Sequence, residues 1–110
     1  MHYKIPRRTV RTGPEAKGAL RIRRYLEARG WLVIKLHGGK YQSGLPDFFI
    51  IHIVHGLKWM ETKAKGEKLR RSQLGMFGLL DKFGQEVFVL TDEQDYPKLF
   101  NKPNWREFAL

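Results

Sequence analysis

The chain has 110 residues, of which 42% are apolar, and its 21 Lys and Arg outweigh 11 Asp and Glu to give a formal charge of +10. This length and apolar content fit one globular domain and argue against wholesale disorder. The sequence contains no cysteine, which excludes disulfides, thiolate zinc sites and cysteine nucleophiles and suits a reducing compartment.

The excess of basic residues is typical of nucleic-acid-binding proteins, although a soluble domain can also be basic without such a partner. The N-terminus is basic but lacks the apolar run of a signal peptide. No stretch approaches the roughly 18 apolar residues that a membrane span needs. We therefore expect no membrane association.

Residues 1–11 are expected to form a basic arm, which either contacts phosphates or is a solvated tail. Thr12 and Glu15 fit a capping box at the start of a helix that runs to about Arg29 and ends at Gly30. Glu15 has two interpretations, as a capping carboxylate or as an acid directed at the sheet. The pattern places Arg21, with its basic neighbours, on the solvated face of this helix.

Residues 31–37 are rich in β-formers and predict a first strand, followed by a polar, glycine-rich loop over 38–44. Two apolar runs, 48–54 and 57–63, then flank a short turn and predict a β-hairpin. A two-residue turn would direct Asp47 away from Glu61 and Lys63. A three-residue turn over 54–56, with Gly56 in the left-handed region, pairs Asp47 with Lys63 and puts all three side chains on one face.

A basic loop over 64–69 precedes a second helix, which begins near Arg71 or Ser72 and runs to Phe83. A fourth strand over 86–90 then follows, and a strand–helix–strand step of this kind predicts a parallel crossover. Residues 91–94 fit another capping box, for a short helix ending near Phe100. The order α-β-β-β-α-β-α predicts an α/β fold with a mixed central sheet flanked by helices.

The acids and the lysine at the end of the hairpin suit metal-dependent hydrolysis of a phosphodiester. Mg²⁺ prefers hard oxygen ligands, which the carboxylates of Asp47 and Glu61 and the backbone carbonyl of Thr62 would supply. Lys63 would hold the attacking water and stabilise charge on the phosphate. Glu15 is an additional candidate ligand. The alternative is that Glu61 and Lys63 form an ordinary surface ion pair.

Pro46-Asp47 followed by Glu61-Thr62-Lys63 resembles the motif of the PD-(D/E)xK nuclease superfamily, and the order of the elements is similar. With Ser43-Gly44-Leu45 and with Gln73 in the next helix, these residues resemble the VRR-NUC (virus-type replication-repair nuclease) family. The resemblance spans about residues 15–90. It departs from the family at Arg70-Arg71, where a Ser-Pro helix start is more usual.

The resemblance implies a restriction-endonuclease-like αβββαβ core and a DNA endonuclease that depends on Mg²⁺ or Mn²⁺. It implies catalytic or metal-binding roles for Asp47, Glu61, Lys63 and Glu15, and a polar site residue in Gln73. It also implies branched DNA such as four-way junctions as substrate, a homodimer, and a cytoplasmic location in a bacterial or phage-infected cell.

We expect one domain over residues 1–110, with an arm (1–11), a core (12–91) and a C-terminal helix and tail (92–110). Gly75, Gly78 and the aromatic tail are candidates for a dimer interface. The alternatives are a non-catalytic nucleic-acid-binding module and an RNase on the same core. Polar and basic residues around the acids are expected to contact DNA; they are Lys35, His37, Lys40, Tyr41, Gln42, Lys65, Lys68, Arg70 and Arg71.

Overall fold

The computed structural model describes residues 14–36 and 43–110, with the backbone alone for 14–16. The predicted order of helices and strands is confirmed. Three strands are shorter than the apolar runs that predicted them, and the strand predicted over 57–63 begins and ends one residue earlier. The elements are α1 (Pro14–Glu27), β1 (Leu32–Lys35), β2 (Phe48–His52), β3 (Gly56–Thr62), α2 (Arg71–Lys82), β4 (Val87–Leu90) and the 3₁₀ helices η1 (Glu93–Phe100) and η2 (Trp105–Phe108). Within the described residues, no helix is long and apolar enough to cross a membrane.

The four strands form one mixed sheet in the order β1-β2-β3-β4. The first three strands pair antiparallel, and β4 pairs parallel with β3. The parallel pair needs a crossover, which α2 provides, as the sequence predicted. The α/β prediction is therefore confirmed.

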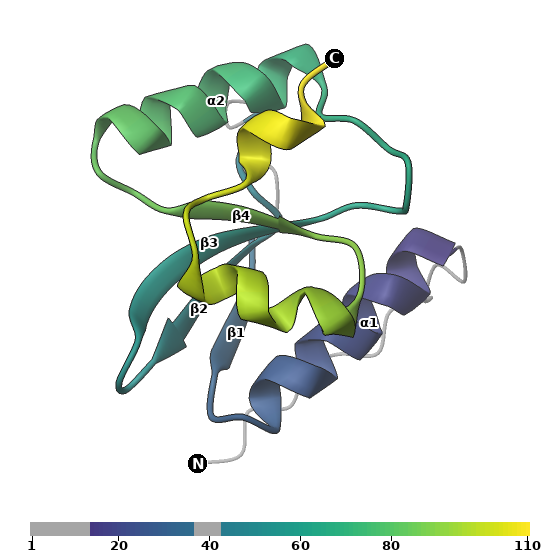
Figure 1. Ribbon diagram of the computed structural model, residues 1–110, viewed down its shortest axis with the longest axis vertical. Coiled ribbons are helices and arrows are strands. Elements are labelled where there is room, and N and C mark those ends of the chain that lie inside the picture. Colours follow the sequence, from purple (N-terminus) through teal and green to yellow (C-terminus); the bar gives the residue numbers. More distant parts are fainter. Residues whose placement is uncertain (1–13, 37–42) are drawn as a thin grey trace.

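Helices cover both faces of the sheet (Figure 1), so the molecule has three layers. On one face, Ile22 and Leu26 of α1 pack with Phe88 and Leu90 of β4. On the other face, Phe77 of α2 packs with the remaining β4 residues and with the C-terminal segment. All four β4 residues are buried because both faces of this strand are covered.

The turn of the β2–β3 hairpin has three residues, but they are not the three that the sequence predicted. The register pairs Phe48 with Met60 and His52 with Gly56, so the turn comprises residues 53–55. Gly56 has φ +74°, the left-handed conformation that was expected of it. The pairing is displaced by two residues, which keeps the faces unchanged but brings Asp47 opposite Glu61 instead of Lys63.

The C-terminal segment, a candidate for a dimer interface, packs on its own chain through Trp105. Trp105 is buried, and its ring meets that of Phe77 edge to face with centroids 6.3 Å apart. A Cβ atom at Gly78 would lie 3.8 Å from the Trp105 ring. Intrachain packing therefore explains Gly78, whereas a Cβ atom at Gly75 would meet nothing within 4 Å.

The second predicted capping box is displaced by one residue. The N-cap of η1 is Asp92, whose carboxylate accepts a hydrogen bond from the Gln94 N–H, and Asp95 takes the reciprocal position.

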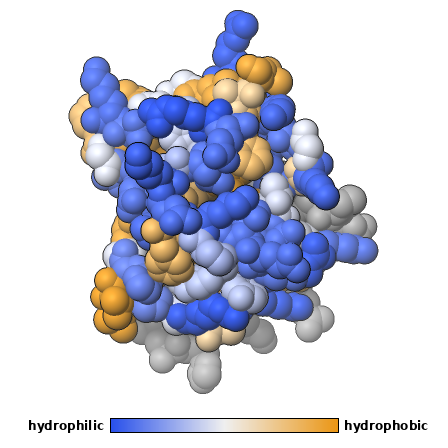
Figure 2. Space-filling view, in the orientation of Figure 1, coloured by the Kyte–Doolittle hydropathy of each residue, from blue (hydrophilic) through white to orange (hydrophobic). Residues whose placement is uncertain are grey.

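Figure 2 shows that hydrophilic side chains dominate the visible face, with apolar atoms at the lower left, where Figure 1 places the tip of the β2–β3 hairpin.

Candidate active site

The end of the β2–β3 hairpin brings two carboxylates together. The backbone N–H of Asp47 donates to Oε1 of Glu61 over 3.1 Å. The Asp47 carboxylate in turn accepts hydrogen bonds at Oδ2 from Thr62, over 3.3 Å from the hydroxyl and 3.5 Å from the N–H. The ladder between the strands ends at Phe48 and Met60, so the Asp47 side chain occupies the edge of β3 that β2 leaves free.

Lys63 lies on the same side of the sheet as Glu61, two residues further along the chain. Its ammonium is 3.5 Å from Oε2 of Glu61. Only 7% of Lys63 and 2% of Glu61 is exposed, so this is not the solvated surface ion pair that was the alternative interpretation. Buried charges of this kind need partners, because desolvation is expensive.

Gln73 in the first turn of α2 completes the buried polar group. Its side-chain amide donates to Oε2 of Glu61 over 2.9 Å, and its oxygen accepts from the Arg70 N–H over 2.9 Å. One side chain thus orients Glu61 and satisfies a free N–H at the helix start.

Gly44 holds the preceding loop against the first turn of α2. It is buried with φ +90°, and a Cβ atom at this position would lie 2.6 Å from the Ser72 carbonyl carbon. Only glycine fits both the conformation and this approach. The loop that leads into Asp47 and the helix that carries Gln73 are therefore fixed to each other.

The environment of Glu61 disfavours its charge. Burial, followed by the charge of Asp47, raises the pKa of its carboxyl from 4.5 to about 7, although Lys63 and the hydrogen bonds from Asp47 and Gln73 lower it. Two carboxylates therefore face a single ammonium, and the balance of charge favours an added cation.

The donor set fits a hard divalent cation. The N–H of Trp59 donates to Glu86, directly before β4, and the N–H of Lys63 donates to Leu90 of β4. The backbone groups of Thr62 therefore face the opposite edge, where its N–H meets Asp47. The N–H and C=O of one strand residue point to the same side. The carbonyl of Thr62 and the carboxylates of Asp47 and Glu61 thus lie at one edge, with the oxygen ligands that Mg²⁺ and Mn²⁺ prefer.

Glu15 is the predicted site residue that the structure does not place. It lies in the first turn of α1, but its side chain is outside the described part. Among the described side chains, no group of three or more His, Asp or Glu gathers at one point. Asp47 and Glu61 are thus a pair within this part of the chain.

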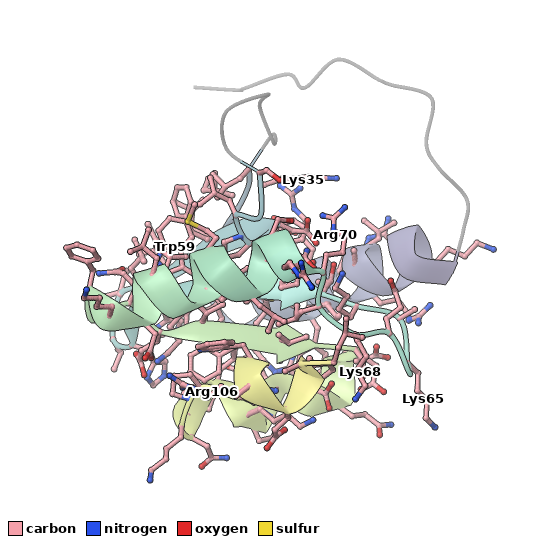
Figure 3. All side chains as sticks on the ribbon, turned by 90° about the horizontal axis from the view of Figure 1, so that it is seen from above. Lys35, Trp59, Lys65, Lys68, Arg70 and Arg106 are labelled. Carbon is pink, nitrogen blue, oxygen red and sulfur yellow. The ribbon has the colours of Figure 1, made fainter. Side chains whose placement is uncertain are left out.

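The predicted DNA-contacting residues that the structure describes are all exposed. They are Lys35, Lys65, Lys68, Arg70 and Arg71. In Figure 3, Arg70 lies at the start of α2, and Lys65 and Lys68 project from the loop between β3 and α2. Lys35 ends β1. The other four predicted contacts, His37, Lys40, Tyr41 and Gln42, lie outside the described residues.

The helical pattern assigned Arg21 to the solvated face of α1, and the structure confirms that it is exposed. Sequence reasoning did not predict that Arg21 also lines a hollow between α1 and the end of β3, together with Lys63 and Lys65. No local signal marks its position, because the facing walls come from segments about 40 and 70 residues later in the chain.

Comparisons with known proteins give one informative result. No family model and no curated protein matches the chain. A solved structure described as a "VRR_NUC domain" matches with a TM-score of 0.69 and 28% sequence identity, over 79% of this chain and 94% of that chain. The resemblance predicted from the sequence is thereby confirmed: this chain has the restriction-endonuclease-like α/β fold of a VRR-NUC nuclease domain.

Proposed function

We propose that this chain is a Mg²⁺- or Mn²⁺-dependent DNA endonuclease. The observation that carries the proposal is the convergence of Asp47, Glu61 and Lys63 at one end of the hairpin, with Lys63 only 3.5 Å from Glu61. The similarity to a VRR_NUC domain supports a nuclease. We further propose that residues 1–110 form one nuclease domain that acts in the cytoplasm of a bacterial or phage-infected cell.

The residues of the site would have different roles in phosphodiester hydrolysis. Asp47, Glu61 and the Thr62 carbonyl would hold the cation, with Glu15 as a further candidate ligand. A bound divalent cation would supply positive charge to polarise the phosphate and to acidify water. The ammonium of Lys63 would hold the attacking water and stabilise the charge that develops on the phosphate oxygens. The oxygen of the attacking water bonds to phosphorus as the bond between phosphorus and the leaving oxygen breaks. The water gives up its proton to solvent, and the leaving oxygen takes up a proton from solvent.

Gln73 acts on this chemistry through Glu61. Its hydrogen bond holds Oε2 of Glu61, while Oε1 accepts the Asp47 N–H. Each carboxylate oxygen has a second lone pair, which a cation could use. Residues that orient the ligands of a metal affect affinity and rate without touching the substrate. We therefore assign Gln73 a positioning role.

We propose branched DNA, such as a four-way junction, as the substrate. The formal charge of +10 supports a polyanionic partner. The exposed lysines and arginines flank the acids, whose own charge would otherwise repel phosphates. A homodimer would present two such sites to a substrate with two-fold symmetry.

An exposed apolar patch at the turn of the β2–β3 hairpin, opposite the end that carries the carboxylates, supports the homodimer. Ile53 is 100% exposed, Val54 77% and Leu32 56%. The register places Leu32 and Leu57 on either side of Ile51, so the patch continues across three strands. The mass in solution tests this proposal: Ile53→Lys should yield monomers, and an unchanged dimer would exclude this patch as its interface.

A substrate panel tests the function. The protein is incubated with plasmid, linear duplex, a four-way junction and RNA of the same sequence, with Mg²⁺, Mn²⁺ or EDTA. We expect metal-dependent cutting of DNA, fastest for the junction. Binding without cutting would favour the non-catalytic module, and preferential cutting of RNA would favour an RNase.

A further inference from the structure

A hollow of about 240 Å³ lies on the α1 side of the candidate active site. The first turns of α1, the loop after β3 and the turn after β4 converge there (Figure 1). Its volume is several times the roughly 30 Å³ that one water occupies in the liquid. The residues of its lining that matter here are Gly18, Arg21, Thr62, Lys63, Lys65 and Asp92.

The hollow shares a wall with the reacting centre. Two of its lining residues touch the two carboxylates directly: the Thr62 hydroxyl is 3.3 Å from Asp47, and the Lys63 ammonium is 3.5 Å from Glu61. A group bound in the hollow would therefore adjoin any group held by the carboxylates.

The hollow keeps two groups that can bind an anion. Of its three basic residues, Arg21, Lys63 and Lys65, the Lys63 ammonium already pairs with Glu61. The single lining acid, Asp92, accepts a 2.7 Å hydrogen bond from the Gln94 N–H because it caps η1. The donors that remain for an anion are the exposed Lys65 and the terminal nitrogens of Arg21.

Arg21 retains donors for such an anion. Its Nε lies 3.5 Å from a Glu93 oxygen, and its side chain is 57% exposed. A Cβ atom at Gly18 would lie 3.9 Å from Nη2 of Arg21, so that terminal nitrogen lies over the buried glycine. A guanidinium has five N–H donors in a fork that suits phosphate, so one contact with Glu93 leaves several free.

We propose that this hollow binds a phosphate group of the DNA strand being cut, next to the phosphodiester at Asp47 and Glu61. Arg21 and Lys65 bind this phosphate. The inference rests on the proposed nuclease function. The bound phosphate is either an internal phosphodiester or a terminal phosphate at a strand end, because both present the same anionic oxygens to Arg21 and Lys65.

The first test is the binding of junction DNA in EDTA, measured against salt concentration, which does not depend on cutting. Each phosphate contact that is lost lowers the slope of log affinity against log salt by about one. We expect this reduction in Arg21→Ala and in Lys65→Ala. Arg24→Ala is the matched control, because Arg24 is an exposed arginine of α1 that does not line the hollow; it should bind as the wild type does.

The second test is cleavage of DNA in which single phosphates near the cut are replaced by neutral methylphosphonates. A methylphosphonate at one of these positions should slow cleavage by the wild type about tenfold, the equivalent of one lost contact. The same substitution should not slow cleavage by Arg21→Ala, because that variant already lacks the contact. Substrates with a terminal phosphate or a hydroxyl at that position separate the two sources.

The outcomes distinguish this inference from the function on which it rests. Wild-type slopes in both Arg21→Ala and Lys65→Ala would overturn the phosphate site, as would a methylphosphonate penalty that persists in Arg21→Ala. A wild-type protein that cuts no unmodified DNA would overturn the nuclease proposal, and the binding slopes would still decide the phosphate site. Because Arg21→Ala removes the contact with Glu93, a thermal melt confirms its fold, and Lys65→Ala changes only an exposed loop residue.

Discussion

The side-chain amide of Gln73 donates a 2.9 Å hydrogen bond to the carboxylate of Glu61, and both residues are 2% exposed. This bond joins the first turn of α2 to the end of β3. It makes the geometry of a candidate metal ligand depend on where a helix begins.

Replacing Gln73 with Met keeps the volume of the side chain but removes this bond. We expect a 10- to 100-fold loss of metal affinity or cleavage rate, the range observed for residues that orient metal ligands. Because the hydrogen bond lowers the pKa of Glu61, its loss should also move the acidic limb of the pH–rate profile to higher pH. Gln94→Met, at an exposed position, is the control. An unshifted profile in Gln73→Met would argue against a positioning role.

Lys58 on β3 and Lys63 directly after it provide a matched comparison, because each is 7% exposed and each pairs with a glutamate. Lys58 contacts Glu86, away from the carboxylate pair. We expect Lys63→Met to slow cleavage by about 100-fold or more, while Lys58→Met retains the wild-type rate. Single-turnover rates on the same DNA measure both. Equal rates for the two variants would remove Lys63 from the mechanism.

The raised pKa of Glu61 predicts how stability depends on pH in EDTA. Between about pH 4.5 and about pH 7, the folded protein keeps the Glu61 proton that the unfolded chain has released, so this residue makes folding less favourable as pH rises. The effect is worth roughly 3 kcal/mol across that interval. Glu61→Gln should therefore gain stability relative to the wild type as pH rises.

Urea unfolding at several pH values measures this difference. Adding Mg²⁺ or Mn²⁺ should restore stability to the wild type above pH 7 but not to Glu61→Gln, because the cation binds the ionised carboxylates. Glu86→Gln, at an exposed site, should show little of either effect. A pH-independent difference between wild type and Glu61→Gln would contradict the burial argument.

Gly44 and Gly56 both have positive φ, but only Gly44 is crowded. Gly44→Ala should lower the free energy of unfolding by about 2 kcal/mol or more, because strain and the clash with Ser72 add together. It should also slow cleavage, since Ser72 precedes Gln73. Gly56→Ala, with nothing within 4 Å of its new methyl group, should cost about 1 kcal/mol and leave cleavage unchanged. Equal losses in the two variants would show that the approach of Gly44 to α2 is unimportant.

Much of the fold could be predicted because its signals are local. Apolar runs and glycines located the hairpin and α2, and alternation along β3 placed Glu61 and Lys63 on one face. The parity argument required an odd number of turn residues, and the turn has three. It could not choose between registers that differ by two residues, because both keep the same faces.

The parts that could not be predicted depend on tertiary packing. Burial of Glu61 under α2 is what raises its pKa, and its sequence neighbours do not reveal that burial. The approach of Gly44 to Ser72, and the hollow that Arg21 lines together with Lys63, both join segments that are far apart in the chain. The sequence also did not show that Trp105 of the aromatic tail packs on Gly78 within its own chain.

Single-turnover cleavage of a four-way junction by the wild type and by Asp47→Asn, with Mg²⁺, Mn²⁺ or EDTA, tests the central claim most directly. Binding of the same junction in EDTA confirms that the variant still engages DNA. We predict cutting by the wild type only with a divalent metal, and at least about 100-fold slower cutting by Asp47→Asn at comparable affinity. Cutting in EDTA at the full rate, or full activity in Asp47→Asn, would contradict the proposed active site.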